Sequence, residues 1–316
     1  MKRFLTGILI LSILFLVCFV PVTRQTETKI EASIIDVSMQ LNQADRWKLW
    51  HTPLKQAFKV MPLGYMVTND YSQHIFSIKT PQLSYTITNP DAGTFKIRVL
   101  EKGKPLYCRL RLSIIPGTTS TAVVSDTKTT MINTLFANDR QHEIANEICK
   151  NLKEFMETPG LYYGFPIHVR GVIDSNVAVL KKTVAVNEKF SILPRLLEDL
   201  KRYASTNKLT VMQPPMLQFD QFGKDSLNIV MMLAVNKPGP NENSIRCGKM
   251  PARGRMLVGR FEGKFIDRTQ LNGALDKYIV DKNLESIVSS YEKYFSYPLP
   301  EHDSSEVDLE IYYPIL

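Results

Sequence analysis

The stretch that decides the fold of the C-terminal half is its closing strand, VDLEIYYPI, at residues 307–315. Apolar side chains occupy every second position and so fall on one face of a strand, while Glu310 and Tyr312 fall on the other. Three predicted elements precede it: a strand at Met256–Gly263, a helix at Asp267–Val280 and a strand at Tyr291–Pro298. The segment therefore predicts an order of strand, helix, strand, strand.

The same order of elements occurs once before. Its members are a strand at Val177–Val186, a helical stripe from Phe190 to Tyr203, and strands at Met216–Phe222 and Ser226–Val235. In the last of these strands, Asn228 stands where the later copy has Glu310. We therefore predict that residues 176–316 are a duplicated strand–helix–strand–strand unit, with both halves closing one sheet about a pseudo-twofold axis.

This half resembles the GyrI-like, AraC-type effector-binding domain. The resemblance is carried by MLVGRFEGKF at residues 256–265, by Tyr291–Pro298 and by LEIYYP at residues 309–314. It implies a sheet with helices on one face and, on the other, a cleft for a small ligand that is often cationic and aromatic. Phe265 replaces the family's usual tyrosine, and Asn228 replaces a second carboxylate.

The N-terminal half has a different order of elements. We predict a short strand at Ile34–Met39, a short helix carrying Trp47 and Trp50, several antiparallel strands, and a long helix from about residue 139 to residue 158. With RWKLW at residues 46–50, this order resembles a START-like helix-grip domain (SRPBCC, polyketide cyclase type) over residues 29–158. The resemblance implies a cavity lined by the two tryptophans; packing of both in the core is the alternative. Residues 159–175, rich in glycine and proline, are predicted to be a linker.

The first residues resemble a targeting segment. Phe4–Val22 contains no charged residue and follows Lys2 and Arg3. Its nineteen residues suffice to cross a bilayer as a helix, and no small-residue cleavage site follows it. We predict a transmembrane anchor within residues 1–24, with a cytoplasmic N-terminus and an extracytoplasmic globular part. Cleavage of this segment is the alternative.

Composition and motifs exclude several functional classes. A chain of 316 residues with 44% apolar residues suffices for roughly two domains. The net charge of +8 is spread along the chain without a run of five basic residues, which argues against a nucleic-acid partner. Cys108, Cys149 and Cys247 lack metal-binding spacing, and no phosphate-binding or catalytic signature is present. We predict no metal and no cofactor.

The candidate site lies on the second face of the C-terminal sheet. Glu310 and Tyr312 together suit a ligand cation, through charge pairing and a cation–π contribution of about 0.5–2 kcal/mol. The strand at Ser226–Val235 is apolar on both faces, which places Val230 and Met232 beside them. A pocket explains this pattern, but packing against another domain or a second copy of the chain explains it equally well.

The predicted fold class is α+β: a transmembrane helix, a helix-grip domain and a GyrI-like domain. The predicted function is a membrane-tethered protein that senses or sequesters a small amphipathic or cationic molecule. One alternative is a hydrolase of small electrophilic compounds with Glu310 as the base. Another is a protein-interaction scaffold, which predicts a stable homodimer or complex and no small-molecule ligand.

Overall fold

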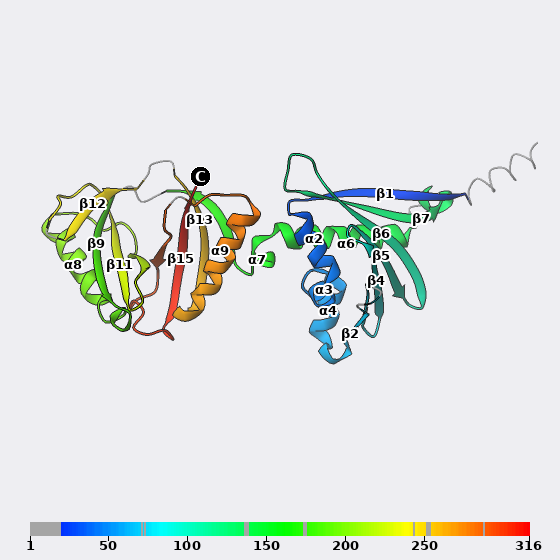
Figure 1. Cartoon of the computed structure of the whole chain (residues 1–316), viewed down its shortest axis with the longest axis horizontal. Coiled ribbons are helices and arrows are strands. Elements are labelled where there is room, and N and C mark those ends of the chain that lie inside the picture. Colours follow the sequence, from blue (N-terminus) through cyan, green and yellow to red (C-terminus); the bar gives the residue numbers. More distant parts are fainter. Residues whose placement is uncertain are drawn as a thin grey trace, which may run out of the picture. The chain divides into compact units, whose positions relative to one another are not determined.

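The chain divides into two compact units, one ending at Thr158 and the other beginning at Pro159. The computed structural model describes residues 20–70, 72, 74–135, 139–172, 176–242, 244–250, 254–286 and 288–316. Each unit has its own antiparallel sheet. Figure 1 labels the elements of both.

The N-terminal unit contains a strand, three short helices, further strands and a long helix. The elements are β1 (Pro21–Ile30), α2 (Ile34–Asn42), α3 (Ala44–Trp50), α4 (Thr52–Val60), η1 (Pro62–Gly64), β2 (Met66–Asp70), β3 (Ile75–Lys79), β4 (Leu83–Asp91), β5 (Thr94–Glu101), β6 (Lys104–Ile114), β7 (Thr121–Thr130), α5 (Met131–Leu135) and α6 (Arg140–Glu157).

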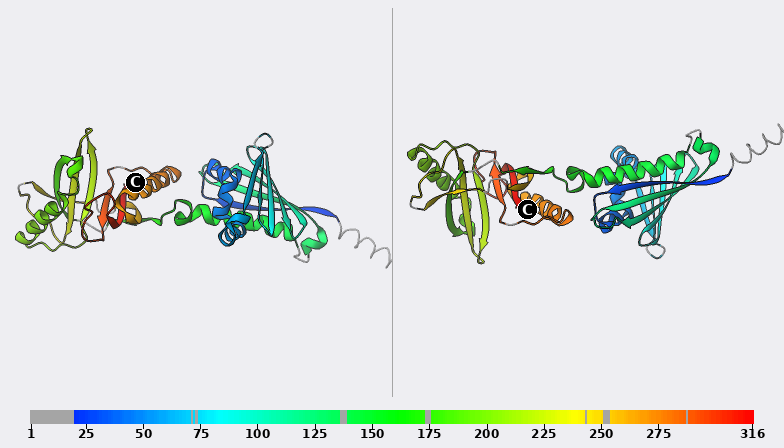
Figure 2. Two further views of the ribbon diagram at one scale, coloured as in Figure 1. Left: turned by 90° about the horizontal axis from the view of Figure 1, so that it is seen from below. Right: turned by 90° about the horizontal axis from the view of Figure 1, so that it is seen from above.

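These strands form a sheet in the order β1-β7-β6-β5-β4-β3-β2, so that the first strand joins the last. Helix α6 packs along β1, β7 and β6 (Figure 2). Its buried stripe includes Ile148 and Leu152, which meet the apolar face of the sheet. The opposite face of the sheet carries polar and charged side chains in the same alternation.

At the start of this unit one prediction is corrected and one strand was not predicted. The predicted strand at Ile34–Met39 is part of helix α2, because Ser33 caps that helix by accepting a hydrogen bond from the Asp36 amide at 3.1 Å. Residues 21–30 form a strand whose inward positions are mostly threonine and arginine, so apolar alternation does not reveal it.

The predicted fold class and location are also corrected at the N-terminus. Residues 1–19, which include most of the predicted anchor, lie outside the described residues, and Pro21 and Val22 begin β1. Over the part of the chain that the structure describes, no helix is long and apolar enough to cross a membrane. The fold class of the described residues is therefore α+β in two units, without the predicted transmembrane helix, and the predicted single-pass membrane location is withdrawn.

The C-terminal unit has two related sets of elements with short additions. They are α7 (Pro159–Tyr162), β8 (Ile167–Gly171), β9 (Asn176–Ala185), η2 (Val186–Glu188), α8 (Leu193–Thr206), β10 (Met216–Phe222), β11 (Ser226–Val235), β12 (Ile245–Lys249), β13 (Arg255–Lys264), η3 (Phe265–Arg268), α9 (Thr269–Asp281), β14 (Tyr291–Tyr294) and β15 (Glu306–Ile315). Residues 159–175, expected to be a linker, therefore carry α7 and β8.

The sheet of this unit is symmetric in its order, β12-β9-β11-β10-β14-β15-β13-β8. The first set, β9-α8-β10-β11, and the second, β13-α9-β14-β15, meet at the seam between β10 and β14. Only two residue pairs form this seam, Met216 with Lys293 and Leu217 with Glu292. Helix α8 packs on β9 and β11, and α9 packs on β13 and β15 (Figure 1).

The larger hydrophobic core of this unit lies between the sheet and its helices. Leu197 and Leu200 of α8 and Leu275 of α9 meet strand residues such as Ile229 and Leu309. We call this side of the sheet the helix face. Alternation sends the intervening strand residues to the other side, which we call the second face.

Candidate functional site

The second face carries a hydrophobic cluster of its own. None of its members comes from a helix. They are Val177, Met216, Met232, Ala234, Met256, Val258, Tyr291 and Tyr312, all of them buried. Strand β11 contributes to both clusters, with Ile229 and Met231 on the helix face and Met232 and Ala234 on the second face. Its continuous apolar sequence is thus explained by burial on both sides.

Glu310 lies beside this cluster and is held by two neighbours. Its Oε2 atom forms an ion pair with Nη2 of Arg170 at 2.5 Å and accepts a hydrogen bond from the Tyr312 hydroxyl at 2.5 Å. The Arg170 guanidinium also stacks 4.7 Å from the centre of the Tyr312 ring. The glutamate side chain is 13% exposed and that of Arg170 is 29% exposed, so the pair is half-buried. Such charge-assisted contacts are the strong ones among protein hydrogen bonds.

Two further residues of β14 complete this part of the face. Tyr291 stacks on Tyr312, with ring centres 4.8 Å apart and planes inclined by 9°. Lys293 pairs with Glu310 in register and lies 5.1 Å from the centre of the Tyr312 ring, although only 3% of the lysine is exposed. Glu310 therefore has both Arg170 and Lys293 as cationic neighbours within the protein.

A hollow of about 550 Å³ adjoins the cluster. Its floor includes Met232, Met256 and Tyr291, and its rim includes Arg255 and Ser289. The remaining lining residues are Val172, Gln218, Met250, Gly254, Val288, Pro314, Ile315 and Leu316. This volume lies in the range of small-molecule sites, and the lining is mainly apolar with few polar groups, as such sites are.

The structure brings some of the predicted site residues together. Met232 lines the hollow, Val230 packs against the same cluster, and Tyr312 is one stacked ring away. Glu310 adjoins Tyr312 but does not line the hollow. Asn228 lies farther along β11, where its Oδ1 accepts a hydrogen bond from the Thr183 hydroxyl at 2.7 Å.

The other predicted site residues lie elsewhere. Phe265 is buried in the helix-face core, where its ring contacts Phe190 and Phe219. Trp47 and Trp50 are buried in the N-terminal unit, with ring centres 4.6 Å apart. Phe265 therefore lies on the helix face, away from Glu310, and the two tryptophans lie in the interior of the N-terminal unit.

The register of the sheet also revises the symmetry argument. Along one row across the sheet, Met232 pairs with Met216, Met216 with Lys293, and Lys293 with Glu310. Met232 and Glu310 thus stand at equal distances on either side of the seam. The two strand sets nevertheless match position by position: Val230 is the fifth residue of β11 and pairs with the sixth of β9, and Glu310 is the fifth of β15 and pairs with the sixth of β13. Val230, and not Asn228, is therefore the counterpart of Glu310 in the duplicated unit.

Sequence reasoning missed Arg170, the partner of Glu310. It belongs to β8, which pairs with β13 at the edge of the sheet. The signal is weak because β8 is five residues long and follows a segment rich in glycine and proline. Tyr291 and Lys293 were detectable, since their spacing of two within a predicted strand places them on one face.

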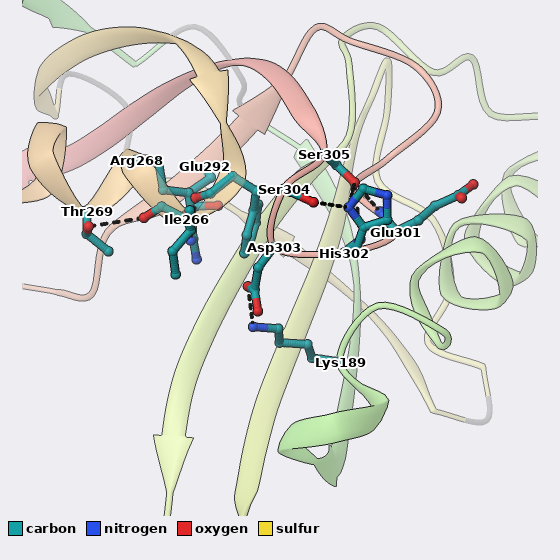
Figure 3. A network of polar contacts seen from close by, with 11 residues as sticks. Lys189, Ile266, Arg268, Thr269, Glu292, Glu301, His302, Asp303, Ser304 and Ser305 are labelled. Carbon is teal, nitrogen blue, oxygen red and sulfur yellow. Dashed lines mark hydrogen bonds and ion pairs between the residues drawn. The ribbon is translucent and has the colours of Figure 1, made fainter.

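A buried charge network also lies on the helix face, and Figure 3 shows part of it. Nε of Arg268 donates to Oε1 of Glu292 at 2.8 Å, and the Tyr294 hydroxyl donates to the other carboxylate oxygen. The same guanidinium stacks on Phe265 at 3.5 Å. Burial and the adjoining glutamate raise the pKa of Tyr294 well above its usual value. Because the carboxylate already has two donors, we regard this network as structural.

The same close-up shows an ion pair between Lys189 and Asp303, with Nζ and Oδ1 2.7 Å apart. The two residues line a hollow of about 700 Å³ with Phe190 and His302. Its rim is mixed in polarity, and Lys189 also lies 4.6 Å from the centre of the Phe190 ring. The lysine is thus held by an acid and an aromatic ring of the protein itself.

The interior of the N-terminal unit holds an aromatic cluster. Nε1 of Trp47 donates to the Leu41 carbonyl at 3.1 Å, and His51 lies between Trp50 and Tyr85. Burial lowers the pKa of His51 to about 3, so this imidazole is neutral at physiological pH. Its Nδ1 and Nε1 of Trp50 are buried without a hydrogen-bond partner among the described residues.

Two buried cysteines and the acidic residues suggest no further chemistry. Burial raises the pKa of Cys108 and of Cys149 to about 12, so both are thiols at neutral pH and poor nucleophiles. Within the described residues, no group of three or more histidine, cysteine, aspartate or glutamate side chains is arranged to hold a metal ion.

Comparisons with known proteins give structural similarity only. No family model matches the chain, and no curated protein matches it. The C-terminal domain of EcmrR covers 48% of this chain and 98% of its own length, at 20% identity and a TM-score of 0.40. EcmrR in complex with DNA covers 58% of this chain and 75% of its own, at 16% identity and a TM-score of 0.41. An uncharacterized conserved protein from Listeria innocua covers 48% of this chain and 92% of its own, at 12% identity and a TM-score of 0.38.

Proposed function

We propose that the C-terminal unit binds a small amphipathic molecule in the hollow of the second face. The observation that carries this proposal is the apolar hollow of about 550 Å³ over Met232, Met256 and Tyr291, on the side of the sheet that has no helix in its core. Methionine side chains adapt to ligands of different shapes, and a tyrosine ring offers a flat stacking surface. Sensing or sequestration of such a molecule requires no chemistry beyond binding.

The polar end of the ligand would lie toward the charged side of the face. Arg255 lies at the rim, and the ion pair of Arg170 with Glu310 adjoins Tyr312, whose ring stacks on Tyr291 of the floor. A cationic ligand would have to compete with Arg170 for the carboxylate, whereas a neutral or anionic polar group would not. We therefore favour an amphipathic ligand without a positive charge over the cationic ligand predicted from the sequence.

The repeated element order supports the further proposal that residues 176–316 form a GyrI-like effector-binding domain. Likewise, a sheet whose first strand pairs with its last, followed by the long helix α6, supports the proposal of a START-like helix-grip domain, which includes β1 and so begins at residue 21 and not at the predicted residue 29. Both remain interpretations from element order and from the sequence motifs that carry the resemblance.

A hydrolase is less favoured than a binding protein. A general base needs a carboxylate oxygen that can reach the substrate's proton. Oε2 of Glu310 is engaged by both Arg170 and Tyr312, and the glutamate does not line the hollow. The scaffold alternative, in which a second protein covers the same face, is distinguished by the experiment below.

The test uses three aromatic probes of similar size and different charge: tetraphenylphosphonium, N-phenyl-1-naphthylamine and 1-anilinonaphthalene-8-sulfonate. Calorimetric titration of the whole chain should show binding of at least one probe with a stoichiometry of one. At 100 times its dissociation constant, that probe should stabilise the C-terminal unit by about 2.7 kcal/mol. The preferred charge then identifies the polar end of the ligand.

Two matched variants locate the binding. Ser289→Trp places an indole at the rim of the hollow and should weaken probe binding at least about tenfold, whereas Ser205→Trp, on the exposed side of α8, should leave it unchanged. Equal effects of the two variants, or no binding of any probe, would contradict the proposal. A stable dimer of the original chain that Ser289→Trp dissociates would instead identify the face as a protein interface.

A further inference from the structure

The outer face of the N-terminal sheet, the face that α6 does not cover, contains a second hollow of about 940 Å³. Five of its lining residues are basic and one is acidic. The basic residues are Lys96, Arg98, Arg109, Arg111 and Lys128, and the acidic residue is Asp126. All five basic residues are exposed, and they come from three neighbouring strands, β5, β6 and β7.

Two of these basic residues face each other directly. Lys96 of β5 and Arg109 of β6 are partners in the strand register, which places their Cβ atoms about 4.5–5.5 Å apart. Arg98 lies on the same face, two residues along β5 from Lys96. Like charges at directly opposed positions destabilise a sheet. Stability of the sheet alone therefore does not account for this arrangement.

The one carboxylate in the hollow does not neutralise this pair. Asp126 is the register partner of Arg109, yet both of its oxygens accept hydrogen bonds from Arg111, at 2.9 and 3.1 Å. Among the described residues, no acidic side chain forms an ion pair with Lys96, Arg98 or Arg109, nor with Lys128. Four positive charges thus converge on one hollow without a counter-charge from the described protein.

The hollow is built into the sheet and does not depend on mobile surface side chains alone. The pairing of β6 with β7 ends at Arg109 and Asp126, and beyond this point the two strands separate. Gln141 of α6 bridges the gap: its Oε1 accepts from the Tyr107 amide at 2.9 Å, and its Nε2 donates to the Lys128 carbonyl at 3.1 Å. The hollow is therefore held in shape by backbone hydrogen bonds to one glutamine.

We propose that this hollow binds a small molecule that carries two or more phosphate or sulfate groups. Arginine and lysine at neighbouring positions suit phosphate oxygens, and an anion would offset the repulsion between Lys96 and Arg109. Neutral hydrogen-bonding groups of Thr86, Thr88 and Gln25 also line the hollow. Its volume is that of a small-molecule site. Tyr107 is its one aromatic lining residue, whereas single-stranded nucleic acids need several rings for successive bases.

Inorganic triphosphate is the probe for the test, titrated calorimetrically into the whole chain at low and at physiological salt. The double variant Lys96→Gln/Arg109→Gln should lose binding about 30-fold or more. The control Lys55→Gln/Lys59→Gln removes the same charge from the exposed side of α4 and should stay within about twofold of the original chain. A large loss in the first double variant and little change in the control would support a specific triphosphate site, since attraction by net charge alone would weaken equally in both.

Three outcomes would overturn the proposal. One is the absence of triphosphate binding at low salt by the original chain. Another is an equal loss in the two double variants, which would show that net charge alone attracts the anion. The third is tighter binding of a decathymidylate than of triphosphate, with the same dependence on Lys96 and Arg109, which would assign the face to single-stranded nucleic acid.

Discussion

Both units place basic side chains on a sheet face that no helix covers, but the clusters around Glu310 and around Lys96 differ in how far these charges are neutralised. On the C-terminal sheet, Arg170 pairs with Glu310, and Arg260 pairs with Asp308 at 2.8 Å. On the N-terminal sheet, Lys96 faces Arg109, and the adjoining carboxylate, that of Asp126, is paired with Arg111. A basic side chain that is paired with a carboxylate stabilises the local structure. A basic side chain without a counter-charge destabilises the unliganded protein and is free to bind an anionic ligand.

The largest expected effect comes from breaking the neutralised arrangement. Glu310→Gln should lower the free energy of unfolding of the C-terminal unit by about 1–3 kcal/mol, because Arg170 and Lys293 lose a half-buried counter-charge. Denaturant unfolding followed by far-ultraviolet circular dichroism measures it. Asp308→Asn is the matched control on the same strand; its pair with Arg260 is more exposed and should contribute about 0–1 kcal/mol. Equal losses would contradict the distinction between the two pairs.

A second difference between the units is their response to acid. His51 has a pKa of about 3 in the folded N-terminal unit and about 6.5 in the unfolded chain. Between these values the unfolded chain binds a proton that the folded unit does not, so stability falls as the pH is lowered through this window. From pH 7.5 to pH 5 the loss from this residue should be about 2 kcal/mol.

Tryptophan fluorescence isolates this effect, because both tryptophans of the chain, Trp47 and Trp50, lie in the N-terminal unit. Replacing the buried imidazole in His51→Phe should remove most of the loss at pH 5. The control is His74→Asn, at an exposed turn with φ of 52°, a conformation that asparagine adopts readily. An unchanged acid response in His51→Phe would show that other groups are responsible.

The smallest expected effect is a gain in stability, opposite in sign to the loss expected from Glu310→Gln. Lys96→Gln should stabilise the unliganded N-terminal unit by about 0.2–1 kcal/mol, because it removes the repulsion from Arg109. Lys104→Gln is the control on the same pair of strands; Lys104 faces Glu101 in register, so its loss should be neutral or destabilising. Thermal unfolding monitored by tryptophan fluorescence measures both. Destabilisation by Lys96→Gln would mean that Lys96 already has a partner of opposite charge.

The sequence predicted the elements whose pattern is local. The bounds predicted for β10 and β11 coincide with the structure, and the alternation of the last strand placed Glu310 and Tyr312 on one face. Strand β1 was not predicted, because three of its five inward side chains are arginine or threonine and because the apolar stretch before it continues through Pro21 and Val22.

The contact of Arg170 with Glu310 could not be predicted from a local sequence pattern. The two residues are 140 positions apart in the chain, and the spacing of apolar and polar residues does not reveal contacts between such distant positions. The uncompensated charges of the outer face were missed for the same reason. Lys96 and Arg109 are ordinary exposed residues in the sequence, and they become a pair only through the register of β5 and β6.

The narrow seam of the C-terminal sheet has a consequence for how a ligand is oriented. Two identical subunits joined about a dyad must place the same side chain on both sides of it, so a ligand bound across the dyad has two equivalent poses. In this chain the two sides are separate stretches of one polypeptide, and they differ: Val230 stands on one side and Glu310 at the matching position on the other. At this pair of positions the face is apolar on one side of the seam and charged on the other, so a molecule lying across the seam there has a single preferred direction.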